Sequence, residues 1–160
     1  MDRWLYLVAA SAHVLAAVVW LGGAFFLALV GAPVLRRVEP AELRRELFDR
    51  LGRRFRVVGW IAVAVLLASG TALLALRGWL GPALDGSLWA TPSGRLLGAK
   101  LAAVAGMLGV TAVHDFVLGP RSAAGPMAES TRRRSAAYAR AGALLGLVAL
   151  LAAVRLSRGL

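Results

Sequence analysis

The sequence contains no cysteine, and among its 160 residues only 8 are acidic and only 2 are histidines. The missing cysteines exclude a disulfide scaffold, a thiolate metal site, a cysteine nucleophile and a CxxC redox pair. The two histidines limit any metal site to few imidazole ligands. Charged residues make up only 17% of the chain whereas 59% is hydrophobic, and this balance argues against a water-soluble fold.

Long apolar runs indicate four membrane-spanning helices. We expect spans at about 4–34, 56–77, 95–119 and 136–156, each long enough to cross a hydrocarbon layer of ~30 Å. The first run is about twice as long as the core of a signal peptide and further spans follow it, so we interpret it as a helix of the mature protein. The chain is therefore predicted to be one all-α membrane domain over residues 1–160, a four-helix bundle.

Basic residues predict how the bundle is oriented. Eight arginines lie between residues 36 and 56 and five between 121 and 140, whereas only five lie on the opposite side of the predicted spans. By the positive-inside rule, both basic segments are cytoplasmic and both termini face outward. The net charge of +11 is thus explained by the lipid bilayer as partner rather than by nucleic acid.

An amphipathic helix is predicted between the first two spans. Leu43, Leu47 and Leu51 repeat with helical spacing, opposite a face on which Glu46 and Arg50 stand four residues apart. We interpret this segment as an interfacial helix lying on the cytoplasmic membrane surface.

Candidate site residues lie in the predicted outer half of the membrane. His13, Ala16, Trp20 and Gly23 form one helical stripe, and small residues there let a neighbouring backbone approach. A histidine inside a span is either a hydrogen-bonded packing residue or an axial heme or copper ligand, because ionisable groups in lipid are costly.

Lys100 either extends its charge toward the interface or pairs with an anionic ligand. Because His13 and Lys100 precede Pro33 and Pro120 by equal numbers of residues, we expect similar depths.

Four other polar side chains belong to the same region. Ser69 and Thr71 fall near the depth of His13, where they either bond a buried ligand or, as we favour, bond back to their own helix. Arg77 and Arg95 lie at the outer mouth, where an arginine holds carboxylates such as heme propionates or anchors in lipid headgroups.

Two further residues are candidate metal ligands. Met107 is a thioether of the kind that Cu(I) accepts, although a single methionine is commonly core filler. His114 follows Lys100 by 14 residues, or about 21 Å of helix, so it lies near the cytoplasmic surface and does not share a metal with His13.

Several short motifs, taken in order, resemble the copper-resistance D (CopD) domain family. They are HVLAAVVWLGG from His13 to Gly23, Gly31-Ala32-Pro33, GRRFRVVGW from Gly52 to Trp60, Ser69-Gly70, GRLLGAKL from Gly94 to Leu101, and HDFVLGPR from His114 to Arg121. The resemblance implies a bacterial inner-membrane protein linked to copper uptake or tolerance. The first-span His13 and third-span Lys100 are also similar to the functional pair of the heme b-containing membrane protoporphyrinogen oxidases.

Three functions remain open from the sequence. In copper handling, His13, Met107 and His114 would be metal ligands. In heme b binding, with electron transfer or porphyrinogen oxidation, His13 would be the axial ligand and Trp20, Arg95 and Lys100 would surround the cofactor. The third is a structural or assembly subunit without a cofactor. Gly142 and Gly146 form a small-residue face that packs inside the bundle or joins protomers or another membrane subunit.

Overall fold

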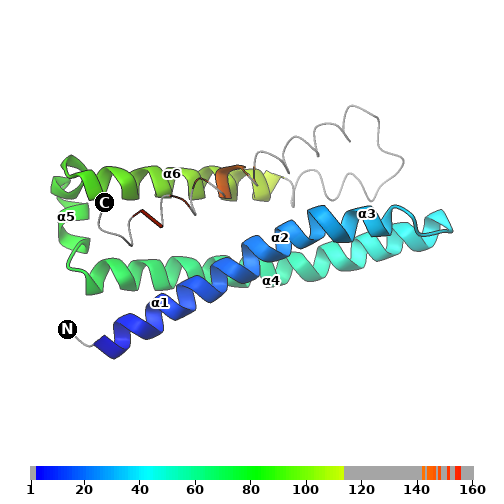
Figure 1. The fold of residues 1–160 in the computed structure, drawn as a ribbon, viewed down its shortest axis with the longest axis horizontal. Coiled ribbons are helices and arrows are strands. Elements are labelled where there is room, and N and C mark those ends of the chain that lie inside the picture. The colour runs from blue at the N-terminus through cyan, green and yellow to red at the C-terminus, as the bar shows by residue number, and fades with distance from the viewer. Residues whose placement is uncertain are drawn as a thin grey trace. The chain divides into compact units, whose positions relative to one another are not determined.

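The computed structural model describes residues 3–113 and, further along the chain, residues 142, 144–146, 148, 151, 154 and 155. Within these residues every element is a helix and there is no strand (Figure 1). The fourth predicted span, 136–156, lies mostly outside the described residues, and His114 lies outside them too. The chain divides into two compact units, residues 1–85 and 86–160, so the single domain expected over 1–160 stays a prediction.

The first apolar segment of the chain is helical throughout, but it is not a uniform α-helix. It comprises α1 (Arg3–Ala17), the π-helical turn η1 (Val18–Gly22), α2 (Gly23–Phe26), a second π-helical turn η2 (Leu27–Gly31) and α3 (Ala32–Leu35). A π turn closes its hydrogen bonds over five residues instead of four. Counting residues back from Pro33 at α-helical spacing therefore does not translate directly into depth on this segment.

The helix α4 (Ala41–Leu76) is longer than the second span that the sequence predicted at 56–77. It runs for 36 residues, about 54 Å at the α-helical rise, and includes both the amphipathic segment and the predicted second span. The expectation of a separate interfacial helix is wrong, because the two segments are continuous. The physical reason is local: from Leu51 to Val57 there is no proline, and the arginines around Gly52 are good helix formers.

Two glycines with positive φ follow α4, one at its C-terminus and one after the next short helix. Gly78 has φ +69°, and the N–H groups of Gly78 and Trp79 bond the carbonyls of Ala75 and Leu74. This is the Schellman arrangement, which ends a helix with a residue in the left-handed region that glycine adopts without strain. The short helix α5 (Leu80–Leu84) comes next, and Gly86, with φ +91°, begins the second unit.

Within the first unit, the N-terminal segment and α4 form an antiparallel hairpin (Figure 1). Paired contacts occur along its length, so that residue numbers rise on one helix as they fall on the other. From one end to the other, the pairs are Tyr6 with Arg77, His13 with Ser69 and Gly70, Trp20 with Gly59, Gly23 with Phe55, and Gly31 with Leu51.

The second unit begins with the 3₁₀ turn η3 (Ser87–Ala90) and continues as α6 (Pro92–Val113). The hydroxyl of Thr91 accepts the N–H of Gly94 at 2.9 Å, which caps the N-terminus of α6. A Cβ on Gly94 would overlap the backbone carbonyl of Leu88, so only glycine fits there. Near the other end, a Cβ on Gly142 would lie 3.7 Å from Val110, which places Gly142 in packing within this unit.

Among the described residues, three helical segments are long and apolar enough to cross a membrane: Arg3–Leu35, Ala41–Leu76 and Pro92–Val113. They confirm the first three predicted spans as apolar helices. Many of their large apolar side chains point outward, where water would be unfavourable and lipid is not. Examples with more than half of their surface exposed are Leu15, Leu29 and Ile61.

Candidate functional site

The first unit brings His13 against α4 at a polar point between two apolar helices. The Nδ1 atom of His13 lies 2.9 Å from the hydroxyl oxygen of Ser69. Ser69 is only 7% exposed, and among the described residues it is the one polar side chain that is buried. The hydroxyl also donates to the carbonyl of Val65 at 2.6 Å, with a longer contact of 3.3 Å to Leu66.

Ser69 confirms the interpretation favoured from the sequence and makes a contact that the sequence did not indicate, whereas bonding of a buried ligand stays a prediction. It bonds back to its own helix, as expected, and it also contacts the imidazole of the neighbouring span. Thr71 does only the first: its hydroxyl donates to the carbonyl of Leu67 at 2.9 Å, and the residue is exposed. The two hydroxyls lie two residues apart on one helix, but only Ser69 points toward His13.

Gly70 is a contact residue that sequence reasoning missed. A Cβ at this position would lie 3.3 Å from Cε1 and 3.7 Å from Nδ1 of His13. The absence of a side chain thus lets the imidazole ring lie directly on the backbone of α4. The pair Ser69-Gly70, a small polar residue next to the smallest residue inside a span, was the signal available in the sequence.

Trp20 packs two turns further along the same stripe. It is 8% exposed, and a Cβ on Gly59 would lie 3.4 Å from Cδ1 and 3.6 Å from Nε1 of its indole. Ala16, also buried, lies between His13 and Trp20. The predicted stripe is confirmed as the packing face toward α4, whereas a cofactor contact of Trp20 stays a prediction.

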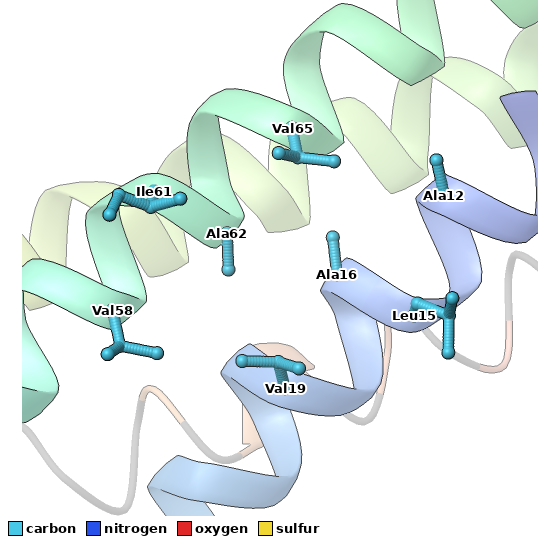
Figure 2. Close-up of a pocket in the computed structure, with 8 residues that line it drawn as sticks. All are labelled: Ala12, Leu15, Ala16, Val19, Val58, Ile61, Ala62 and Val65. Atoms are coloured by element: carbon cyan, nitrogen blue, oxygen red, sulfur yellow. The ribbon is translucent and has the colours of Figure 1, made fainter.

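An open apolar groove of about 440 Å³ runs beside this contact line, between the N-terminal segment and α4. Figure 2 shows that all its lining side chains are aliphatic, so the groove offers no ligand to a metal ion. Its lining suits apolar groups such as hydrocarbon chains instead. The lining residues are Ala12, Leu15, Ala16 and Val19 from the N-terminal segment, and Val58, Ile61, Ala62 and Val65 from α4.

Arg77 connects the two helices of the hairpin at the end nearest His13. Its Nη2 donates to the hydroxyl of Tyr6 at 2.6 Å, and its guanidinium carbon lies 5.6 Å from the Tyr6 ring and 5.5 Å from the Trp79 ring. Those distances are within the range of cation–π contacts. The convergence of these aromatic residues on one arginine appears only in the fold.

In the second unit, α6 carries the other candidate residues. Met107 is 6% exposed, and Lys100, which is partly buried, lies seven residues before it. That separation returns an α-helix to nearly the same face, about 10.5 Å along the axis. Arg95 is exposed in the first turn of α6 and donates from Nη1 to the carbonyl of Ala90 at 3.2 Å.

The structure thus brings His13 together with Ser69, Gly70 and α4, and it places Lys100 and Met107 on one face of α6. No group of three or more His, Cys, Asp or Glu side chains occurs in the part of the chain that the structure describes. The expected common depth of His13 and Lys100 stays a prediction.

Within the residues that the structure describes, the protein is all-helical, with several helices suited to cross a membrane and a partly buried histidine at the contact between two of them. Comparison with known families identifies the family within this class. The sequence profile of the family "Copper resistance protein D" matches residues 49–156, well over half of the chain. The chain belongs to this family. The matched region contains Ser69, Gly70 and Met107, but it begins after His13.

A curated relative is an uncharacterized protein of Aquifex aeolicus (strain VF5). It is 37% identical over 59 residues, which are 36% of this chain and 40% of the relative. The match thus spans less than half of the relative's own length. No solved structure matches the chain.

Proposed function

We propose that this protein binds copper ions in transit within the inner membrane of a bacterium, in copper transport or tolerance, with the imidazole of His13 as one ligand. Membership of the copper resistance protein D family supports copper as the cargo. The observation that carries the assignment to His13 is its contact with Ser69 at 2.9 Å. This contact holds an imidazole inside an apolar span, where an ionisable group without a role would be costly.

The chemistry of the available side chains suits copper that is bound briefly. Imidazole nitrogen is a ligand for copper, and thioether sulfur selects Cu(I). Few ligands near one another give weak binding, which favours release of a transported ion over permanent retention. We extend the proposal to Met107 and His114 as further ligands, because seven residues separate them in the sequence, the spacing that repeats a helical face.

The two cationic candidates have a different part in this proposal. A protonated lysine or an arginine repels a copper ion at close range. We therefore assign Lys100 and Arg95 to anionic groups, such as the phosphates of lipids at the membrane edge. Trp20 serves as the packing residue that holds the first span against Gly59.

For the whole chain we propose a four-helix bundle in the lipid bilayer with both termini outside. Three apolar helices support this arrangement, and the apolar run at 136–156 supplies the fourth. The basic residues before Val57 then lie on the cytoplasmic side, in agreement with the positive-inside rule. On this arrangement, the end of the hairpin with Tyr6 and Arg77 faces outward, and His13 lies in the outer half.

The test is the metal content and absorbance spectrum of the detergent-purified full chain after incubation with Cu(I) and removal of unbound metal. We expect copper to remain with the wild type, His13→Ala to lose most of it, and the isosteric control Thr71→Val to retain it. Thr71 is a suitable control because its hydroxyl bonds the carbonyl of Leu67 on its own helix.

Other outcomes would overturn the proposal. A heme absorbance band that disappears in His13→Ala would replace copper with heme b as the bound group. Absence of both copper and heme from the wild type would favour a structural or assembly subunit. Equal copper in the wild type and in His13→Ala would remove His13 from the site.

A further inference from the structure

The hydrogen bonds of Ser69 determine which nitrogen of His13 carries the ring proton. A serine hydroxyl has a single hydrogen and two lone pairs. The short bond to the carbonyl of Val65, 2.6 Å, uses that hydrogen because a carbonyl oxygen is only an acceptor. The Ser69 oxygen therefore meets Nδ1 of His13, 2.9 Å away, with a lone pair, and Nδ1 must be the N–H donor.

We propose that Ser69 is a positioning residue that fixes neutral His13 in its Nδ1–H tautomer and so makes Nε2 the metal-binding atom. In a neutral imidazole one nitrogen carries hydrogen and the other carries the lone pair that binds a metal. A hydrogen bond at the first nitrogen orients the ring and selects the second as ligand. The part of this inference that concerns copper rests on the proposed function, whereas the tautomer does not.

Gly70 adds a second constraint on the same ring. Because a Cβ there would approach Cε1 of His13 to 3.3 Å, the ring occupies space beside α4 that a side chain at position 70 would need. Burial of Ser69 at 7% exposure keeps water from competing strongly for its lone pairs. Two consecutive residues of α4 thus control one imidazole: Ser69 selects its proton position, and Gly70 gives it room.

The fold supplies a matched control for this role. Thr71 makes the same kind of bond to its own helix, from its hydroxyl to the carbonyl of Leu67, but it is exposed and this bond involves no histidine. Removal of the Thr71 hydroxyl tests the loss of such a bond alone. Removal of the Ser69 hydroxyl tests the loss of the same bond together with the contact to His13.

The experiment is nuclear magnetic resonance of the copper-free full chain labelled with ¹⁵N at histidine, in lipid bilayers. The ring nitrogen shifts distinguish an N–H nitrogen from one that carries a lone pair, and a His114→Gln variant leaves the signals of His13 alone. We expect the wild type to show Nδ1–H. In Ser69→Ala the ratio of the Nδ1–H to the Nε2–H tautomer should fall by roughly two- to tenfold, the effect of one lost hydrogen bond.

Two variants separate a positioning role from a merely structural one. Ser69→Thr keeps the hydroxyl and should retain the wild-type tautomer, and Thr71→Val should retain it as well. An Nε2–H tautomer in the wild type would overturn the proposal. A tautomer ratio in Ser69→Ala equal to that of the wild type would also overturn it.

Copper binding then distinguishes this inference from the proposed function. Affinity for Cu(I), measured by competition with a chromogenic chelator, should fall about 10- to 100-fold in Ser69→Ala, the usual effect of losing a partner that orients a ligand. It should be retained in Ser69→Thr. If the tautomer changes as expected but the wild type binds no copper, the proposed function fails and the role of Ser69 in orienting His13 stands. If the wild type binds copper and Ser69→Ala changes neither tautomer nor affinity, the role of Ser69 fails and the proposed function stands.

Discussion

Two adjacent glycines of the first span give a sharp test of how closely it approaches α4. Both Gly22 and Gly23 have right-handed helical backbone angles, so alanine fits the backbone at either position. Around Gly22 nothing lies within 4 Å of an added Cβ, whereas at Gly23 the added atom would overlap the ring edge of Phe55. The two substitutions are chemically identical, and they differ in this contact with Phe55.

The expected difference in stability follows from two opposing effects. Replacing a helical glycine by alanine stabilises the folded state by about 0.5–1 kcal/mol, because alanine has less conformational freedom to lose. This gain is common to both variants. Overpacking at Gly23 costs about 1–3 kcal/mol, because the Phe55 ring or the helix backbone must move. Gly22→Ala should therefore be more stable than the wild type, and Gly23→Ala should be about 1–3 kcal/mol less stable than Gly22→Ala.

The assay is reversible unfolding in mixed detergent micelles, with helix content followed by circular dichroism. A third variant, Gly23→Ala combined with Phe55→Leu, provides the control: the smaller side chain removes the overlap, so the destabilisation by Gly23→Ala should shrink in that background. Equal stability of Gly22→Ala and Gly23→Ala would refute the packing of Phe55 against the first span.

Two further predictions concern helix caps, one at the C-terminus of α4 and one at the N-terminus of α6. Gly78→Ala forces a Cβ into the left-handed region at φ +69° and should lower the free energy of unfolding by about 1–2 kcal/mol, whereas Gly81→Ala, in open space, should not. Thr91→Ala removes the cap on the N–H of Gly94 and should cost about 1 kcal/mol, with Ser93→Ala as the control. Both pairs are measured by the same detergent unfolding assay; an effect in a control variant as large as in its partner would contradict the assigned cap.

Local patterns in the sequence predicted much of the helical structure correctly. The apolar runs gave three helices, and their described ends agree with the prediction within a few residues apart from the start of α4, whereas the predicted end of the third span at 119 lies outside the described residues. The pair Glu46 and Arg50, four residues apart, forms the predicted ion pair. These successes share a cause: an apolar run of sufficient length and an i, i+4 pair depend only on residues near one another in the chain.

The site was only partly predictable for a related reason. The stripe of His13 and Trp20 was evident, because helical periodicity places those residues on one face. Which residues of α4 lie opposite was not evident, since any antiparallel pairing satisfies the periodicity equally well. The π turns around Trp20 also escaped prediction, because they depend on how neighbouring turns pack. The continuity of α4 through Gly52 has a local cause, the absence of proline, but the change from an amphipathic to an apolar pattern suggested two separate helices.

The sequence by itself thus determined that the chain is helical and apolar, where its arginines gather, and which few side chains carry chemistry. Only the tertiary structure decided that Ser69 and Gly70 meet His13, that Gly59 receives Trp20, and that Phe55 lies against Gly23. The physical reason is that helix formation is governed by bonds within one segment, whereas the partners of a side chain are set by how two segments interlock. Small residues permit that approach at many positions, and the complementary shapes of both helices select one.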